Sequence, residues 1–457
     1  MASARAIYLA DWVLPIVRPP FRRGGIVVEG ERIVAVGGEA ELRARFPDVP
    51  VRDFGEAALL PGLVNAHAHL ELTALRGMLE DLPFVTWLAT LTRLREGLSA
   101  EELRESARAG VIEAIRSGQT TIADVGATAA GFDALCESGV RGVFFQEVFG
   151  VRPEEAEENV RGLAQRIAAL RARSDVGSRV QVGVSPHAPY SVSAPLFRRT
   201  VDYARTDALP LCVHIAESSA EVELVRRGQG EFARIYERRG LTWRAPRVSP
   251  IRYLHDLGVL AARPLLIHGV HVDEEDMGLI AQSGSTIAHC PKSNAKLGQG
   301  IAPLPEWLRA GIAVGVGTDS VASNNVCDLL EEARFALLVQ RARRASPTLL
   351  NAETMLTLLT LGGARALGLE AHIGTLEPGK AADFVVVALS GAHVQPVDDP
   401  TVALIFSARG NDVCFTAVGG RVLFDGRSVT TLDEERVRAR LREIRARLRS
   451  LLTRASG

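Results

Sequence analysis

The chain has 457 residues and a formal net charge of -1, with 47% hydrophobic and 23% charged residues, as expected for a globular protein of more than one domain. This neutral balance gives no electrostatic footprint for nucleic acid or an anionic membrane, and the apolar runs are too short to span a bilayer. Five scattered cysteines without a C-x-x-C pair suit a reducing cytoplasm and argue against a thiolate metal site, so we expect a cytoplasmic protein, with homo-oligomerisation left open.

Short strand-like runs at both ends of the chain predict a small β-domain. A hairpin is expected around the turn Gly30-Glu31, and similar strand patterns return near the C-terminus. Neither end has enough strands to bury both faces of its own sheet. We therefore predict one composite β-sandwich made from residues 1–58 and 369–430.

Between these ends, strand and helix patterns alternate eight times, which is the number of units that closes a barrel. The first strand is the apolar run that starts at Leu59, and Ser99 with Glu102 makes a capping box that opens the first long helix. Further strands are predicted at 120–124, 142–148, 180–185, 211–215, 265–268, 286–289 and 313–317, and helices at 99–117, 154–173, 194–207, 273–283, 303–310 and 327–343. The fold class is therefore α/β, with a (β/α)8 TIM barrel over 59–368. A doubly wound open sheet is the alternative, but the sequence contains no G-x-G-x-x-G turn to support it.

Two segments fall outside this alternation. Residues 226–254 form an insertion too long for an ordinary connection, and such insertions above a barrel are usually lids or edges of a binding site. The final segment, 431–457, is predicted as a helix, with an apolar stripe at helical spacing formed by Val437, Leu441, Ile444, Leu448 and Leu451. This stripe predicts a surface helix docked on the body of the protein, with an oligomerisation helix as the alternative.

The opening run, LLPGLVNAHAHLEL, ends in two histidines spaced one residue apart. Residues i and i+2 of a strand share a face, so His67 and His69 can aim at one point beyond the strand end. Two converging imidazoles are half of a metal site. For the pair alone, two solvated loop histidines are an equally ordinary interpretation.

Polar residues recur at the ends of the later strands. In a barrel, the carboxyl ends of all strands open on one face, so residues remote in sequence meet at one mouth. These residues are His187, His214, Glu217, His268, His289 and Asp319. Histidine and carboxylate ligands suit Zn²⁺ or another borderline ion, which lowers the pKa of a bound water towards neutrality. We expect ligands from His67, His69, His214 and Asp319, and a proton shuttle at Glu217.

The motifs PGLVNAHAH, HIAES, LIHGVH, GTDS and GKAADFVVV together resemble the amidohydrolase superfamily over essentially the whole chain. The resemblance implies a distorted eight-stranded barrel with a composite β-sandwich. It also implies metal ligands at His67, His69, His214 and Asp319, with Glu217 and His268 as the proton-transferring glutamate and the water-orienting histidine.

The resemblance also bears on the number of metals. Binuclear members of the superfamily bridge two ions with a carboxylated lysine or a glutamate at the end of strand four. Here strand four ends at His187, and the nearest lysines, Lys292 and Lys296, follow strand seven. One divalent ion is therefore expected, zinc with iron as the alternative, and this points to the deaminase branch.

Within that branch, the motifs HLELTALRG, FVTWL, SPHAPYS and HCPKSNAKLGQGIAPL resemble adenosine-type nucleoside deaminases. These act on 5'-methylthioadenosine, S-adenosylhomocysteine or 6-amino-6-deoxyfutalosine. The resemblance implies that His187 contacts the nucleoside sugar and that Glu96 binds ribose hydroxyls, although Glu96 also fits a solvated helix residue. His289 would contact the tetrahedral centre or the base, with a structural role equally open.

One departure concerns the third strand. Relatives that accept methylthioadenosine and adenosylhomocysteine commonly place an arginine soon after it, towards the amino-acid carboxylate. In this chain the strand continues into Gln146 and Glu147, and Arg152 is the nearest substitute. The change weakens the adenosylhomocysteine interpretation, and the HLELT version of the opening motif leans towards aminodeoxyfutalosine.

The expected reaction is hydrolytic deamination at C6 of a 6-aminopurine nucleoside, with water as the second substrate. Glu217 protonates N1, Asp319 and His268 take a proton from the attacking water, and ammonia leaves. Other amidohydrolases, such as a guanine or pterin deaminase or an s-triazine hydrolase, are alternatives. A non-catalytic scaffold would have lost ligands, and here all four ligands and Glu217 are present.

Overall fold

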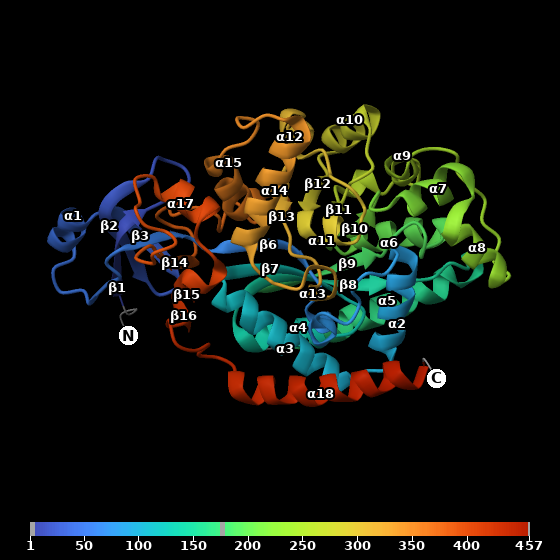
Figure 1. Cartoon of the computed structure of the whole chain (residues 1–457), viewed down its shortest axis with the longest axis horizontal. Coiled ribbons are helices and arrows are strands. Elements are labelled where there is room, and N and C mark those ends of the chain that lie inside the picture. The colour runs from blue at the N-terminus through green and yellow to red at the C-terminus, as the bar shows by residue number, and fades with distance from the viewer. Residues whose placement is uncertain (1–4, 174–178, 456–457) are drawn as a thin grey trace.

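A barrel of parallel strands forms the body of the molecule (Figure 1). The computed structural model describes residues 5–173 and 179–455. Within these residues, eight strands form the barrel: β6 (Leu63–Ala68), β7 (Gln119–Gly126), β8 (Arg141–Val148), β9 (Val180–Pro186), β10 (Cys212–Ile215), β11 (Leu265–His268), β12 (Thr286–His289) and β13 (Val314–Val316). The predicted barrel is confirmed.

The barrel is distorted, because it consists of two four-stranded sheets with few contacts between them. One sheet has the order β6-β7-β8-β9 and the other β10-β11-β12-β13. Single parallel bridges join them, Val184 with Leu211 on one side and Ala68 with Asp319 on the other. Each of the two seams therefore depends on a small number of backbone hydrogen bonds.

Apart from the segment after β10, where no helix was predicted, the principal helices around the barrel lie at the predicted positions with one exception. They are α3 (Ala100–Arg116), α5 (Ala156–Arg171), α6 (Ala194–Thr206), α10 (Glu274–Ser283), α12 (Leu304–Arg309) and α14 (Leu329–Arg344). The capping box of α3 is present, with Ser99 Oγ accepting from the Glu102 amide at 3.2 Å. The exception is α4 (Ala130–Ser138), which was not predicted. It begins at Ala129 without a side-chain cap, so the sequence carries no start signal.

A second sheet combines strands from both ends of the chain, which lie side by side at one end of the molecule (Figure 1). Its order is β16-β15-β14-β5-β1-β2-β3, with β4 beside β1. The strands are β1 (Arg5–Val13), β2 (Phe21–Glu29), β3 (Arg32–Gly38), β4 (Val51–Asp53), β5 (Ala57–Pro61), β14 (Phe384–Ala388), β15 (Val413–Val418) and β16 (Arg421–Phe424). The rings of Tyr8, Phe384 and Phe415 pack together in its core. The composite β-domain is confirmed.

The apolar run that starts at Leu59 was predicted as one strand, and this is wrong. Gly62 divides it, so that β5 belongs to the composite sheet and β6 to the barrel. A Cβ at Gly62 would lie 2.0 Å from Thr120 Oγ1, so only glycine allows the chain to pass from one sheet to the other at this point. Both strands are fully buried, and for this reason hydrophobicity gave no sign of the break.

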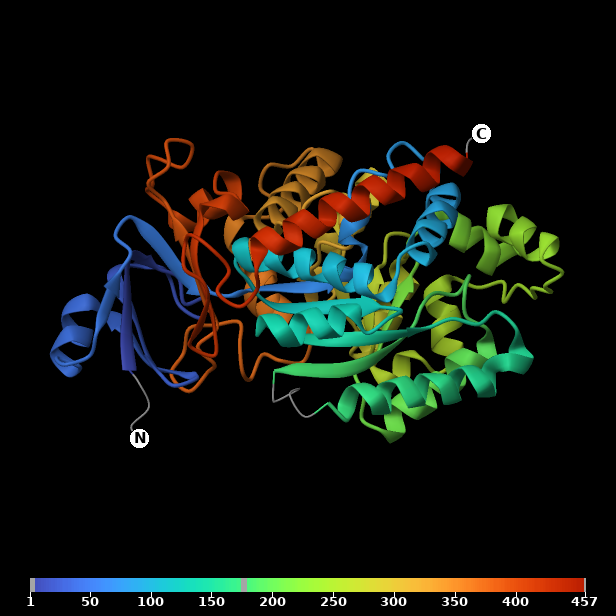
Figure 2. The same cartoon turned by 90° about the horizontal axis from the view of Figure 1, so that it is seen from below.

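The last helix, α18 (Glu434–Ala455), runs along the outside of the barrel beside α3 (Figures 1 and 2). Its own residues Val437, Ile444 and Leu448 are buried against the body of the protein. Arg447 of the same helix forms an ion pair with Glu102 at the start of α3. The predicted docking is confirmed, while the Leu451 side chain lies outside the described residues. No helix in the described part of the chain is long and apolar enough to cross a membrane.

The remaining elements connect these parts. The insertion 226–254 lies between α7 (Ser219–Arg227) and η3 (Leu260–Ala262). It forms α8 (Gly230–Arg238) and the first part of α9 (Pro250–Asp256). The others are α1 (Glu39–Arg45), η1 (Leu70–Leu75), α2 (Phe84–Glu96), η2 (Pro153–Glu155), α11 (Pro291–Lys296), α13 (Val321–Asn324), α15 (Ala352–Thr357), η4 (Leu358–Gly362), α16 (Gly363–Ala366), α17 (Pro400–Phe406) and η5 (Gly410–Asp412).

Candidate active site

Four histidines and one aspartate meet at the carboxyl end of the barrel. The ligand atoms of His67, His69 and Asp319 lie within 4.8 Å of one another, and so do those of His67, His214 and His268. His67 Nε2 is 3.4 Å and His69 Nε2 is 3.7 Å from Asp319 Oδ1. The structure thus brings together all four residues that the sequence predicts as metal ligands.

The hydrogen bonds of three histidines fix which ring nitrogen faces the cluster. The Nδ1 atom of His69 lies 2.8 Å from the Val125 carbonyl oxygen, and that of His214 lies 3.2 Å from the His187 carbonyl oxygen. The Nδ1 atom of His268 lies 2.9 Å from Asn294 Oδ1. Because each Nδ1–H donates outward, the Nε2 lone pair is free to accept a metal ion or a proton.

His67 provides the test of whether a metal fits. It is fully buried, and among the described residues neither ring nitrogen has a hydrogen-bond partner. A buried imidazole without a partner is costly unless something outside the protein satisfies it. The surrounding donors, three imidazoles and one carboxylate, are those that zinc and similar ions prefer. The site is therefore a His/Asp metal site.

Burial favours the neutral form of His67, His214 and His268, which is the form that binds metal. It lowers the pKa of His67 to about 4, and it holds that of His214 well below its usual range. For Asp319, burial acts to raise the pKa, but the nearby rings of His67, His268 and His69 hold it well below the usual range. The aspartate is further fixed by the Ser293 hydroxyl, which donates to Oδ2 at 2.6 Å.

The backbone is strained where these strands end. Ala216, His268 and Asp319 have φ values of 51°, 75° and 57°, in a region that residues with a Cβ rarely adopt. His268 is the last residue of β11, Ala216 directly follows β10, and Asp319 comes shortly after β13. Strain of this kind clusters at functional sites, where the surrounding structure compensates for its cost.

Glu217 lies beside the cluster, with Oε1 3.7 Å from His268 Nε2. Burial, followed by the charge of Asp319, holds the pKa of Glu217 well above its usual range, so that it can carry a proton. Glu221 fixes this loop, because its carboxylate accepts from the amides of Ala216 at 2.9 Å and of Glu217 at 3.0 Å. Glu221 was not predicted as a site residue. Its only indication in the sequence is its position in the first turn of the helix that Ser218 caps.

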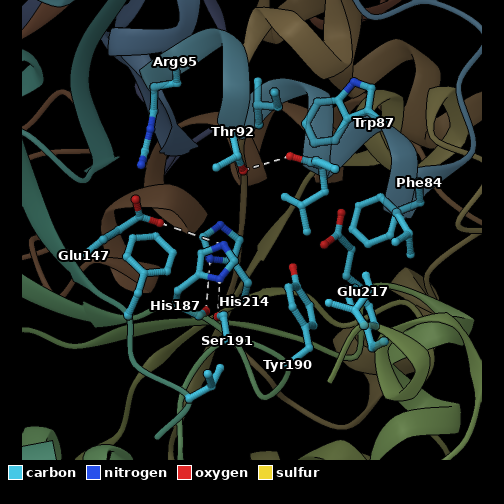
Figure 3. Close-up of a pocket in the computed structure, with 18 of the residues that line it drawn as sticks. Phe84, Trp87, Thr92, Arg95, Glu147, His187, Tyr190, Ser191, His214 and Glu217 are labelled. Atoms are coloured by element: carbon cyan, nitrogen blue, oxygen red, sulfur yellow. Dashed lines mark hydrogen bonds and ion pairs between the residues drawn. The ribbon is translucent and has the colours of Figure 1, made fainter. Parts of the chain in front are cut away.

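A cavity of about 810 Å³ opens from the cluster towards solvent. Figure 3 shows Glu217, His187 and His214 at its inner end, beneath the side chains of α2. Its walls carry Phe84 and Trp87 from α2, and the insertion contributes Phe232 from α8. The rings of Tyr190 and Phe232 stack at 4.3 Å with an interplanar angle of 6°. Such walls suit a flat aromatic ligand.

The other predicted residues fall into two groups. His187, Glu96 and Arg152 line the cavity, and Arg152 lies 3.6 Å from Glu155 at the rim. His289 is not among the residues that line this cavity; its ring lies 5.6 Å from that of Trp307, and among the described residues neither of its ring nitrogens has a hydrogen-bond partner. Both roles considered for His289 therefore remain predictions.

The lysines considered as possible bridging groups are engaged elsewhere. Lys292 Nζ donates to Glu331 at 2.5 Å, and Lys296 Nζ donates to Glu80 at 3.0 Å. His187, which follows β9, lies close to the cluster instead: its ring is 4.9 Å from that of His214.

Glu147 was noted in the sequence only as a departure, yet it lies in the cavity. It lies at the carboxyl end of β8 and is 6% exposed. Its Oε1 atom is 4.0 Å from His187 Nε2. Burial raises the pKa of Glu147 to about 7. The signal that could have identified it is its position at a strand end, which it shares with the predicted site residues.

Sequence comparisons agree with this geometry. The model of the amidohydrolase family matches residues 58–423, and that of a bacterial imidazolonepropionase-like composite domain matches residues 24–48. A 5-methylthioadenosine/S-adenosylhomocysteine deaminase from Moorella thermoacetica is 34% identical over 435 residues, which cover 94% of this chain and 96% of that protein.

Solved structures give the same result. An adenosine deaminase from Xanthomonas campestris with bound zinc superimposes with a TM-score of 0.87 and 29% identity, covering 98% of this chain and 99% of that one. Atrazine chlorohydrolase from Arthrobacter aurescens TC1, complexed with zinc, gives a TM-score of 0.82 and 26% identity, covering 96% and 100%. With its barrel, its composite sheet and its His/Asp site, this chain belongs to the amidohydrolase family.

Proposed function

We propose that this protein is a hydrolytic deaminase that acts on C6 of an adenosine-type nucleoside and releases ammonia. The substrate class is that of 6-amino-6-deoxyfutalosine, 5'-methylthioadenosine and S-adenosylhomocysteine. The observation that carries the proposal is the position of Glu217, a buried carboxyl beside a cluster of neutral histidines at the inner end of an aromatic-walled cavity. The similarity to curated deaminases over 94% of the chain supports it.

His67, His69, His214 and Asp319 would hold one divalent ion. The zinc in two similar structures supports Zn²⁺, with Fe²⁺ as the alternative. When bound, such an ion supplies a water molecule that is nucleophilic at neutral pH. The absence of a bridging group after β9, where His187 stands, supports one ion rather than two.

Two residues move protons in the proposed reaction. Glu217, whose pKa is held well above its usual range by burial and by the charge of Asp319, gives a proton to ring nitrogen N1, which makes C6 more electrophilic. His268 presents an unprotonated Nε2, and with Asp319 it takes a proton from the attacking water. The C6–O bond forms and the C6–N bond breaks. The proton that His268 and Asp319 took from the water is passed to the departing amino group, which leaves as ammonia.

The outer part of the cavity would hold the nucleoside. The rings of Phe84, Trp87 and Phe232 offer apolar surface for the purine and its substituent. His187 and Glu96, both lining the cavity, would contact the sugar. The Glu71 carboxylate of the HLELT motif accepts from the Thr128 hydroxyl and from nearby backbone amides, so this motif also has a structural use.

A substrate panel tests the proposal. Ammonia release is measured from 5'-methylthioadenosine, S-adenosylhomocysteine and 6-amino-6-deoxyfutalosine, and from guanine, pterins and amino-s-triazines. We expect kcat/KM for at least one nucleoside to exceed every other compound by about 100-fold or more. The second candidate is a triazine hydrolase, which the structural similarity to atrazine chlorohydrolase favours. Turnover of triazines without turnover of nucleosides would establish that alternative.

A further inference from the structure

Two buried hydrogen-bond acceptors face each other in the cavity without a donor between them. Glu147 is the last-but-one residue of β8 and is buried, and among the described residues its carboxylate accepts no hydrogen bond. Its closest polar neighbour is His187 Nε2, at 4.0 Å from Oε1. This distance is too long for a hydrogen bond. Figure 3 shows the two groups pointing towards each other beneath Arg95 of α2.

The hydrogen bonds of Ser191 determine what His187 presents to this gap. The Ser191 hydroxyl donates its one proton to the Ala188 carbonyl oxygen at 3.1 Å. Its oxygen lies 2.6 Å from His187 Nδ1, so Nδ1 must be the donor in that contact. In the neutral ring, Nε2 then carries a lone pair and acts as an acceptor. The imidazole and the ionised form of the Glu147 carboxylate are thus both acceptors.

Burial makes this arrangement costly when the cavity holds no donor. Glu147 is 6% exposed, and the ring of Phe149 lies 4.9 Å from that of His187 at the rim. A buried carboxylate without a hydrogen bond costs free energy that a suitable ligand recovers on binding. A ligand atom at about 2.8 Å from both Oε1 and Nε2 fits between them. Such an atom must donate two hydrogen bonds, or two neighbouring donors must share the gap.

We propose that Glu147 and His187 form a subsite for a hydrogen-bond donor group on the sugar side of the substrate, either a pair of sugar hydroxyls or a 5'-ammonium group. The inference rests on the proposed function and deepens it. At this position the Glu147 carboxylate would repel a carboxylate on the substrate, because both groups are negatively charged. Glu147 is therefore a specificity-determining residue, and it acts beside the more exposed Glu96.

A coupling experiment tests this subsite. The variants Glu147→Gln and Glu147→Ala are assayed with 5'-methylthioadenosine, its 2'-deoxy and 3'-deoxy forms, and 5'-amino-5'-deoxyadenosine. We expect each variant to lose at least about 10-fold in kcat/KM on the substrate that carries the donor group. On the analogue without that group, the same variant should lose less than about threefold.

The arms of the experiment separate the two sources of the donor. Coupling with the deoxy forms identifies sugar hydroxyls, and coupling with the 5'-amino compound alone identifies an ammonium group; both support the subsite. Glu154→Gln, at an exposed glutamate after the same strand, serves as the matched control and should leave all ratios unchanged.

Two results would overturn the inference alone, and a third would overturn it together with the proposed function. If both Glu147 variants lose the same factor on every compound while their metal content is normal, the residue has only a structural role. If Glu96→Gln shows the coupling and the Glu147 variants do not, the donor group binds elsewhere. If the wild-type protein releases no ammonia from any of these nucleosides, the proposed function itself fails and the inference falls with it.

Discussion

The inner and outer halves of the cavity are built from different kinds of structure. The inner half consists of residues at the ends of barrel strands, with hydrogen bonds that orient each side chain, as at His69 and His268. The outer half is formed by helices outside the barrel, which contribute Phe84 from α2 and Phe232 from α8. We infer that the barrel residues carry out the reaction, whereas the choice of substrate depends on the helices above the barrel together with Glu147 of β8.

The largest effect should follow from removing the metal. Dialysis against a chelator should abolish ammonia release, because His67 then has no partner and no activated water forms. Turnover should return on addition of one equivalent of Zn²⁺, and the midpoint of thermal unfolding should rise with it. Metal analysis and ammonia release measure both. Full activity in the metal-free protein would show that the inner half works without an ion.

The next effect concerns the proton at Glu217. Glu217→Gln keeps the size and the backbone contacts of the side chain but cannot supply a proton, so kcat should fall by about 10² to 10⁴. The metal content should remain that of the wild type, since Glu217 is not among the proposed ligands. Steady-state kinetics and metal analysis together check this prediction. Near-normal turnover in the variant would end the assignment of Glu217.

A smaller effect is expected in the outer half. Phe232→Ala removes the ring stacked on Tyr190, and KM should rise by about 10-fold while kcat stays within about threefold. Phe424→Ala, in the composite sheet, is the matched control: the ring is equally buried but distant in the fold, so KM should not change. A large fall in kcat for Phe232→Ala alone would break the division between the two halves.

The smallest effect is a pH dependence of stability. Burial raises the pKa of Glu332 to about 8 from an ordinary value of 4.5. Because the folded protein then holds a proton that the unfolded chain releases, the free energy of unfolding should fall as the pH rises from about 5 to 8. One such group contributes at most about 1.4 kcal/mol per pH unit. Denaturant unfolding at several pH values measures the slope, and Glu332→Gln should reduce it. An unchanged slope would rule out Glu332 as its source.

The inner half could be predicted from the sequence because two regularities act together. Buried strands appear as apolar runs, and a barrel brings their ends to one face, so His214 and Asp319 could be placed together although their residue numbers differ by 105. Glu147 obeys the same rule and could have been included. Glu221 could not, because its role depends on the backbone conformation of Ala216.

The outer half could not be predicted in the same way. The pattern of α8 shows which of its faces is apolar, but it does not show that Phe232 packs against Tyr190, which lies 42 positions earlier in the chain, the difference between their numbers. That contact depends on how the insertion folds back over the barrel. The division of the opening run at Gly62 was missed for a similar reason, since both strands are buried and only the approach of Thr120 distinguishes them.

The two seams of the barrel have a consequence for its assembly. At one seam, the Asp319 amide donates to the His67 carbonyl oxygen at 2.9 Å, and at the other the His214 amide donates to the His187 carbonyl oxygen at 2.9 Å. His67 belongs to one half-barrel, while His214 and Asp319 belong to the other. An ion held by these three side chains would clasp the half-barrels together. The catalytic centre would then also hold the two halves of the barrel together.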